Sequence, residues 1–299
     1  MIKRMITWLL SISALFSGER QFDAQRAFQF LEKQVTFGYR IPGTDDHKAC
    51  ADWIIERCGA FADTVIVQSF SAYNPFAKKW VDARNIIARF RPGESDRVML
   101  STHWDTRPVS DMDFAKPFMP VPGANDGASG TAVLLELLDK IQALDMKAGL
   151  DIVFWDAEDM GIAGSGRYFC QGSEFYALHP LAPVPQKGIL IDMIGDKDLE
   201  LPIEKNSMLY APELVMSVWN IAAELGYQHI FKKQTGPEVY DDHVPLNTLA
   251  GIPTIDIIDF SYTHMGRNLW HTTKDLPAFC SPRSLQCVGE TLLLWLSRQ

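Results

Sequence analysis

The sequence predicts an α/β fold in which a twisted, mostly parallel mixed sheet is flanked by helices. Segments of strand length alternate along the chain with longer segments that have helical periodicity. Several of the strand segments are nearly continuous apolar runs, as expected for strands that are covered on both faces. No linker interrupts the pattern, so the 299 residues are expected to form one domain after a leader.

The first half of the chain predicts two helices followed by three strands. Helices are expected where apolar residues recur at helical spacing, at 23–36 and 46–59. Strands follow at 63–73, 83–90 and 97–104. A loop rich in Pro, Asp and Gly then covers 105–126.

The second half of the chain predicts a regular alternation of helix and strand. Helices are expected at 129–144, near Arg167, at 211–226 and at 284–298. Strands are expected at 150–156, 188–195 and 251–260. Such an alternation is typical of a parallel sheet with crossover helices.

The N-terminus has the pattern of a secretory signal. Lys3 and Arg4 precede an apolar run at 5–16, which is shorter than the ~20 residues of a membrane-spanning helix. Residues 1–18 are therefore predicted to be a signal peptide or N-terminal anchor, and 19–299 the catalytic domain. Export to the periplasm or the extracellular space is expected, and an amphipathic N-terminal helix is the alternative.

Charge and cysteine content argue against a nucleic-acid partner and against a cysteine zinc site. The net charge of −9 argues against nucleic acid as a partner, because phosphate binding requires a basic surface. The five cysteines contain no C-x-x-C pair, so a cysteine zinc site is not expected and the thiols are predicted to be small buried side chains. No membrane span is expected beyond the leader, and the protein is expected to be a monomer.

Acidic groups and a histidine end several of the predicted strands. His103 lies near the end of one strand, Glu158 and Asp159 follow another, and Asp192 ends a third. In open α/β sheets, functional groups gather at the C-terminal edges of the strands. These side chains are therefore predicted to share one site.

The residue types at this edge favour a metal. The segment "DAED" at 156–159 puts three acids beside an apolar strand, and a divalent cation would reduce the cost of burying them. Asp126 lies in a glycine-rich turn that opens a helix. His, Asp and Glu without Cys suit a catalytic zinc. Each motif also has a structural alternative: a solvated acidic loop, a helix cap at Asp126, or a packing role for Trp270 and His271.

The motifs "HWD", "NDGASG", "DAED", "IDMIGD", "DDHVP" and "WHT" occur in this order from about Phe37 to the C-terminus. In this order they resemble the zinc-dependent glutaminyl-peptide cyclotransferases and the co-catalytic zinc aminopeptidases that share their fold. The cyclase pattern implies that one zinc is bound by Asp126, Asp159 and His271. It further implies that Glu158 is the acid/base, that Asp192 and Asp241 bind the substrate by hydrogen bonds, and that Trp270 is a wall of the pocket.

The aminopeptidase pattern uses the same positions for two zinc ions. Asp126 would bridge them, His103 and Asp192 would bind one, and Asp159 and His271 would bind the other. The segment "EDMGIAGSGRYF" resembles the aminopeptidases, and Asp256 stands where many cyclases have a histidine.

The resemblance implies an enzyme that acts on the N-termini of peptides or proteins. The preferred expectation is conversion of N-terminal glutamine to pyroglutamate with release of ammonia, with one zinc per chain. The first alternative is a two-zinc aminopeptidase that removes N-terminal residues. The second is an inactive peptide-binding homologue.

Overall fold

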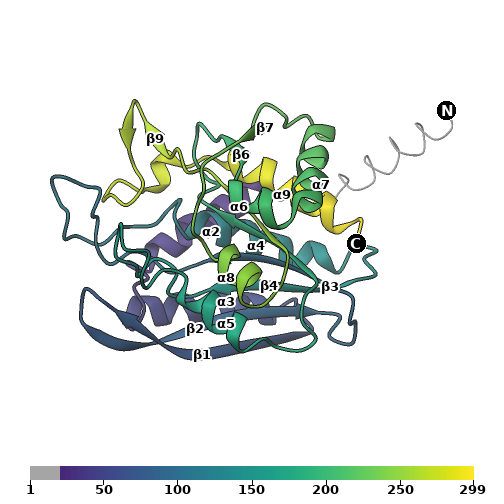
Figure 1. Cartoon of the computed structure of the whole chain (residues 1–299), viewed down its shortest axis with the longest axis horizontal. Coiled ribbons are helices and arrows are strands. Elements are labelled where there is room, and N and C mark those ends of the chain that lie inside the picture. Colours follow the sequence, from purple (N-terminus) through teal and green to yellow (C-terminus); the bar gives the residue numbers. More distant parts are fainter. Residues whose placement is uncertain (1–20) are drawn as a thin grey trace.

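A six-stranded sheet forms the centre of the protein (Figure 1). The computed structural model describes residues 21–299, so the predicted leader at 1–18 lies outside the described residues. The strands follow one another across the sheet in the order β1 (Thr64–Asn74), β2 (Lys79–Phe90), β4 (Gly149–Trp155), β3 (Arg97–His103), β5 (Lys187–Asp192) and β8 (Thr254–Ile258).

The sheet is mixed but mostly parallel, which confirms the predicted fold class. β1 and β2 form an antiparallel pair, and β2 also runs antiparallel to β4. The other neighbours, β4 with β3, β3 with β5 and β5 with β8, are parallel. Every residue of β3 and β4 is buried, as the continuous apolar runs predict, whereas most residues of the edge strand β1 are only partly buried or exposed.

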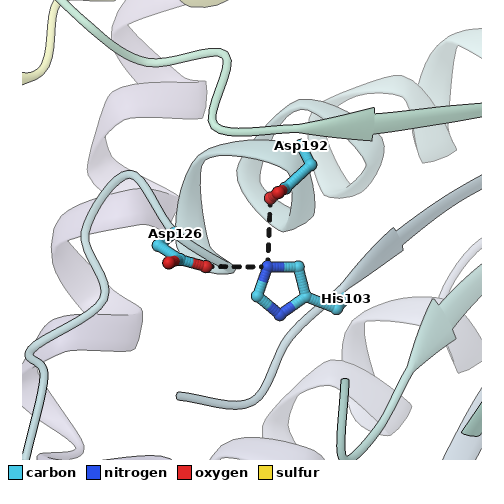
Figure 2. Close-up of side chains that lie close together, drawn as sticks. All are labelled: His103, Asp126 and Asp192. Carbon is cyan, nitrogen blue, oxygen red and sulfur yellow. Dashed lines mark hydrogen bonds and ion pairs between the residues drawn. The ribbon is translucent and has the colours of Figure 1, made fainter. Parts of the chain in front are cut away.

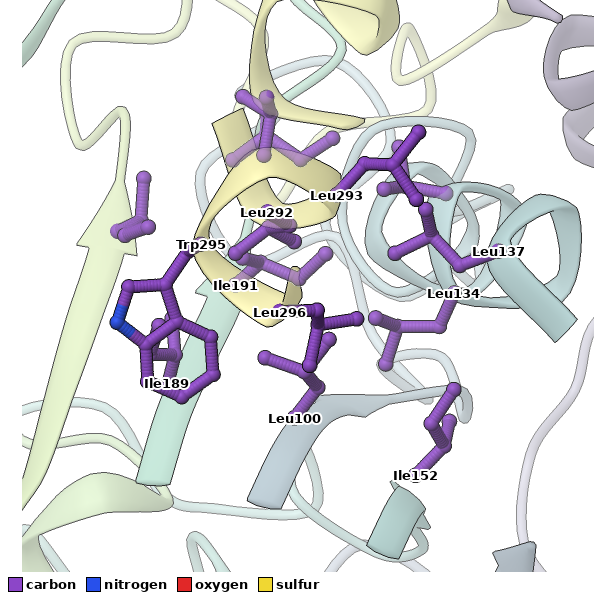
Figure 3. Close-up of a cluster of buried hydrophobic side chains, with 14 of the residues drawn as sticks. Leu100, Leu134, Leu137, Ile152, Ile189, Ile191, Leu292, Leu293, Trp295 and Leu296 are labelled. Carbon is purple, nitrogen blue, oxygen red and sulfur yellow. The ribbon is translucent and has the colours of Figure 1, made fainter. Parts of the chain in front are cut away.

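Helices cover both faces of the sheet, and successive strand residues serve opposite faces. On one face, Leu100 and Ile152 join the main core with α4 (Ala128–Ile141) and α9 (Pro282–Leu296), as Figure 3 shows. The same core receives α2 (Ala24–Thr36), α3 (Asp45–Gly59) and α7 (Pro212–Glu224). On the other face, Met99 and Val153 pack in a smaller cluster that includes Tyr176 of α5 (Gln171–Leu178) and Leu246 of α8 (His243–Thr248).

The short helix predicted near Arg167 is present but begins a few residues later. The residues around Arg167 form an isolated β-bridge with Ile162, and α5 begins only at Gln171. Gly164 and Gly166 have φ angles of 74° and 64°, which a right-handed helix does not contain. The chain therefore turns sharply here before the helix starts.

Several short elements were not predicted from the sequence. They are β6 (Leu201–Ile203), α6 (Lys205–Tyr210), β7 (Phe231–Thr235), β9 (Thr263–His264), β10 (Arg267–Asn268) and η2 (Pro277–Phe279). Such elements are too short to show a period in the sequence. All five cysteines are buried, as predicted, and none of them forms a disulfide. Within residues 21–299, no helix has the length and apolar character needed to cross a membrane.

Close packing of α4 on the sheet predicts a stability effect at Gly130. A Cβ atom on this residue would lie 2.1 Å from Thr102 Oγ1 and 2.8 Å from the backbone oxygen of Ile191. The variant Gly130→Ala is expected to lower the free energy of unfolding by about 1–3 kcal/mol, because the helix must move away from the sheet. Chemical denaturation measures the change.

The matched control is Gly59→Ala at the end of α3. A Cβ atom there meets nothing within 4 Å, so this variant is expected to be neutral or slightly stabilising. Equal denaturation midpoints for the two variants would contradict the packing argument.

Candidate metal and catalytic site

The predicted side chains meet at the C-terminal edge of the parallel strands. His103 is the last residue of β3 and Asp192 the last of β5, while Glu158 and Asp159 follow β4. Asp126 lies just before α4, and the hydroxyl of Thr131 in the first turn of this helix donates a hydrogen bond to the His103 carbonyl at 3.1 Å. The convergence that the strand pattern predicts is therefore present in the fold.

Figure 2 shows a first group of possible ligands, His103, Asp126 and Asp192. The Nε2 atom of His103 lies 3.1 Å from Asp126 Oδ1 and 3.0 Å from Asp192 Oδ1. A second group consists of Asp126, Asp159 and His271. The Nε2 atom of His271 lies 3.7 Å from Asp126 Oδ2 and 3.3 Å from Asp159 Oδ1. Asp126 belongs to both groups, and all five side chains are buried.

The backbone around these side chains is strained. Ala157 precedes Glu158, Met193 follows Asp192, and His271 is itself a candidate ligand. These three residues have φ angles of 57°, 46° and 55°, in a region that non-glycine residues seldom occupy. Strained residues persist only where the surrounding contacts hold them, and they cluster at functional sites.

Buried carboxylates fix the loops that carry the site. Asp105 accepts hydrogen bonds from the backbone N–H groups of Glu158 and Asp159, at 3.1 and 3.2 Å. Asp275 accepts from the backbone N–H groups of Asn125 and Asp126, at 2.8 and 3.1 Å. The sequence pattern "WHTTKD" contains Asp275, but nothing in the spacing indicates that it holds the loop before α4.

Arg107 and Asp111 are two site residues that the sequence did not identify. The guanidinium of Arg107 donates to Asp159 Oδ1 at 3.0 Å and to both carboxylate oxygens of Asp111 at 2.8 and 2.6 Å. Asp111 Oδ1 in turn lies 3.4 Å from His271 Nδ1. Both residues lie in the long loop after β3. This loop has no periodicity, so in the sequence only the charge of the two residues could have indicated a role in the site.

The charges and donor atoms of the second group suit a divalent cation. Burial lowers the pKa of His271, but Asp159 and Asp111 raise it overall to about 9. Burial and the neighbouring Asp159 raise the pKa of Asp126. No partner among the described residues forms a hydrogen bond with the buried Oδ2 atom of Asp159. Two carboxylates and an imidazole are a suitable donor set for a catalytic zinc with an open coordination position, so the residues fit this metal.

A cavity of 260 Å³ opens onto the second group. Glu158, Asp192 and Asp241 contribute carboxylates to its lining, together with the candidate ligands. The apolar part of the lining includes Phe169, Val239, Ile258, Phe260 and Trp270, and the Trp270 ring stacks on that of His271 with centroids 3.7 Å apart. The rings of Phe260 and Trp270 are in contact, with centroids 4.9 Å apart. A lining that combines carboxylates with aromatic rings suits one amino-acid side chain and its polar end group.

Asp256, the position that departs from the cyclase pattern, does not line this cavity. It is fully buried and forms a group with Asp241 and His243, whose possible ligand atoms lie within 4.8 Å of one another. The structure therefore places Asp256 behind Asp241, away from the space available to a substrate.

Comparison with known proteins identifies the family. The model of Peptidase family M28 matches residues 85–296. The chain is 39% identical to Porphyromonas gingivalis glutaminyl cyclase, with a TM-score of 0.88 over 93% of this chain and 99% of that one. It is 35% identical to a Zn-dependent exopeptidase from Parabacteroides distasonis, with a TM-score of 0.88 over 93% and 99% of the two chains.

A curated relative is more distant and longer. The chain is 27% identical to Aminopeptidase YwaD of Bacillus subtilis. The match covers 70% of the present chain and 43% of that protein. The similarity thus includes both cyclases and peptidases with one fold. The chain belongs to Peptidase family M28.

Proposed function

We propose that this protein is a zinc-dependent glutaminyl-peptide cyclotransferase that converts N-terminal glutamine to pyroglutamate and releases ammonia. The observation that carries the proposal is the cavity, whose lining combines Glu158, the group of Asp126, Asp159 and His271, and aromatic side chains. Similarity to a glutaminyl cyclase over nearly all of both chains supports it.

Asp126, Asp159 and His271 would bind the zinc ion. When bound, zinc acts as a Lewis acid that polarises the γ-carboxamide carbonyl of the substrate. Arg107 would orient the ligand Asp159 through its hydrogen bond, and Asp111 would orient the ligand His271 through its contact with Nδ1. Residues outside the ligand set have this role at many metal sites.

Glu158 would move the protons. The α-amine of the substrate attacks the carbonyl carbon of the γ-carboxamide in the same molecule, a C–N bond forms, and the bond from that carbon to the amide nitrogen breaks. Glu158 accepts a proton from the attacking amine and returns one to the leaving nitrogen, which departs as ammonia. Burial raises the pKa of Glu158 well above its usual value, despite the lowering effect of His103. A carboxylate whose pKa is raised accepts a proton more readily than an ordinary carboxylate, which suits a group that takes the proton of an amine.

The remaining lining would orient the substrate and exclude water. Asp192 and Asp241 present carboxylates to the cavity, where they can accept hydrogen bonds from the substrate's nitrogen atoms. Trp270 and Phe260 would cover the glutamine side chain and limit the access of water, which would otherwise compete with the amine. Because the nucleophile and the carbonyl belong to one molecule, correct orientation supplies much of the rate.

The second candidate function is a two-zinc aminopeptidase. The group of His103, Asp126 and Asp192 favours it, because it offers a second set of ligands that shares Asp126 with the first. In that case Glu158 would act as the general base for a water molecule.

Two substrates separate the two functions. The purified protein is given a peptide that begins with glutamine and a chromogenic leucine amide. We expect ammonia and a pyroglutamyl product from the peptide, no hydrolysis of the amide, and about one zinc per chain in a metal analysis. Hydrolysis of the amide without pyroglutamate formation would overturn the cyclase assignment. Absence of both activities, with Glu158→Gln indistinguishable from the unmodified protein, would indicate the inactive peptide-binding homologue.

A further inference from the structure

A buried thiol lies directly beside Glu158. Cys170 stands just before α5 and is completely buried. Its Sγ atom donates a hydrogen bond to Glu158 Oε1 at 3.4 Å, and its backbone N–H donates to the Glu158 carbonyl at 2.9 Å. Cys170 adopts a φ of 55°, so the chain holds this residue in an unfavourable conformation next to the acid.

Asp241 brings a second carboxylate to the same point. Possible ligand atoms of Glu158, Cys170 and Asp241 all lie within 4.8 Å of one another. Asp241 is 3% exposed, and among the described residues no group forms a hydrogen bond with its Oδ2 atom. A buried carboxylate oxygen without a partner is costly, and a cation would remove that cost.

We propose that Glu158, Cys170 and Asp241 form a binding site for a soft divalent cation, separate from the candidate zinc ligands, and that its occupancy inhibits the enzyme. The separation of the atoms suits this role. When a metal ion in a tetrahedral site has bonds of ~2.3 Å to a sulfur ligand and ~2.1 Å to an oxygen ligand, the sulfur and the oxygen lie about 3.6 Å apart. The Sγ and Oε1 atoms are 3.4 Å apart here.

A path to the site leads through the substrate cavity. Glu158 and Asp241 both line the cavity, and Cys170 lies behind Glu158. A cation that enters would replace the thiol proton, so that an S–H bond breaks, a bond from sulfur to the metal forms, and one proton leaves to solvent. Thiolate selects soft cations such as Cd²⁺ and, at higher concentration, Zn²⁺, over hard cations such as Mg²⁺.

Inhibition follows from the two carboxylates that the cation would occupy. This part rests on the proposed function, in which Glu158 moves the protons and Asp241 binds the substrate. A cation bound to both would prevent proton transfer and obstruct the glutamine side chain. The binding site itself depends only on the three side chains, whatever the reaction.

The test is a titration of the zinc-loaded full-length protein with CdCl₂, monitored by thiolate-to-metal charge-transfer absorbance and by enzymatic rate. The candidate zinc group has no thiol, so exchange of Cd²⁺ for zinc there would give no such band. We expect a band that saturates at one Cd²⁺ per chain, together with loss of activity, and no effect from MgCl₂. In Cys170→Ser the band should vanish, and the Cd²⁺ concentration for half-inhibition, relative to that variant's own rate, should rise at least tenfold.

The matched control is Cys58→Ala, which removes a buried thiol that belongs to no group of ligands. It should keep both the band and the inhibition. A band of unchanged intensity in Cys170→Ser, or no band in the unmodified protein, would overturn the site. A Cys170-dependent band without any change in rate would overturn the inhibitory role. Should neither substrate be turned over, the proposed function fails while the absorbance titration still decides the site.

Discussion

Replacement of Glu158 by glutamine is expected to reduce kcat for pyroglutamate formation by about 10²–10⁴-fold. The amide has nearly the same shape as the carboxylic acid but cannot accept the proton of the attacking amine. Glu158 lines the cavity without belonging to the group of Asp126, Asp159 and His271, so the zinc content should stay unchanged. Ammonia release and metal analysis on the same preparation measure both quantities.

The control for this prediction is Glu174→Gln on α5. Glu174 is exposed and does not line the cavity, so the same change of charge should leave kcat within about twofold. A Glu158→Gln variant with the kcat of the Glu174→Gln control would contradict the assignment of Glu158 as the acid/base. Loss of zinc from Glu158→Gln would instead mean that the residue is a ligand.

Removal of Asp126 is expected to abolish zinc binding. Its carboxylate belongs to both groups of candidate ligands, so Asp126→Ala removes a ligand however many ions are bound. The zinc content should fall to background, and turnover should fall below detection. Metal analysis after dialysis measures the first, and circular dichroism checks that the variant is folded.

The zinc content of a companion variant, His103→Ala, shows whether one or two ions are bound per chain. His103 belongs only to the group with Asp126 and Asp192. If one zinc is bound by Asp126, Asp159 and His271, this variant should retain about one zinc per chain. If two ions are bound, the content should fall from about two to about one. Undiminished zinc in Asp126→Ala would contradict both arrangements.

The sequence by itself determined the framework of the fold and the edge of the sheet that carries the site. Continuous apolar runs identified β3, β4 and β5 because strands covered on both faces need no polar residues. The groups at their ends, such as His103 and Asp192, could be assigned to one place because parallel strands end at the same edge. The short helix predicted near Arg167 begins only at Gln171, because Gly164 and Gly166 turn the chain before it.

Only the tertiary structure decided which groups touch. It brings Asp275 to the backbone of Asn125 across 150 positions of the sequence, and it links Arg107 to both Asp111 and Asp159. It also places the Cys170 thiol, which directly precedes α5, against the carboxylate of Glu158. Side-chain periodicity reports which face of an element is buried, but not which neighbour that face meets. Contacts between loops depend on distances that are fixed only when the whole sheet and its helices pack together.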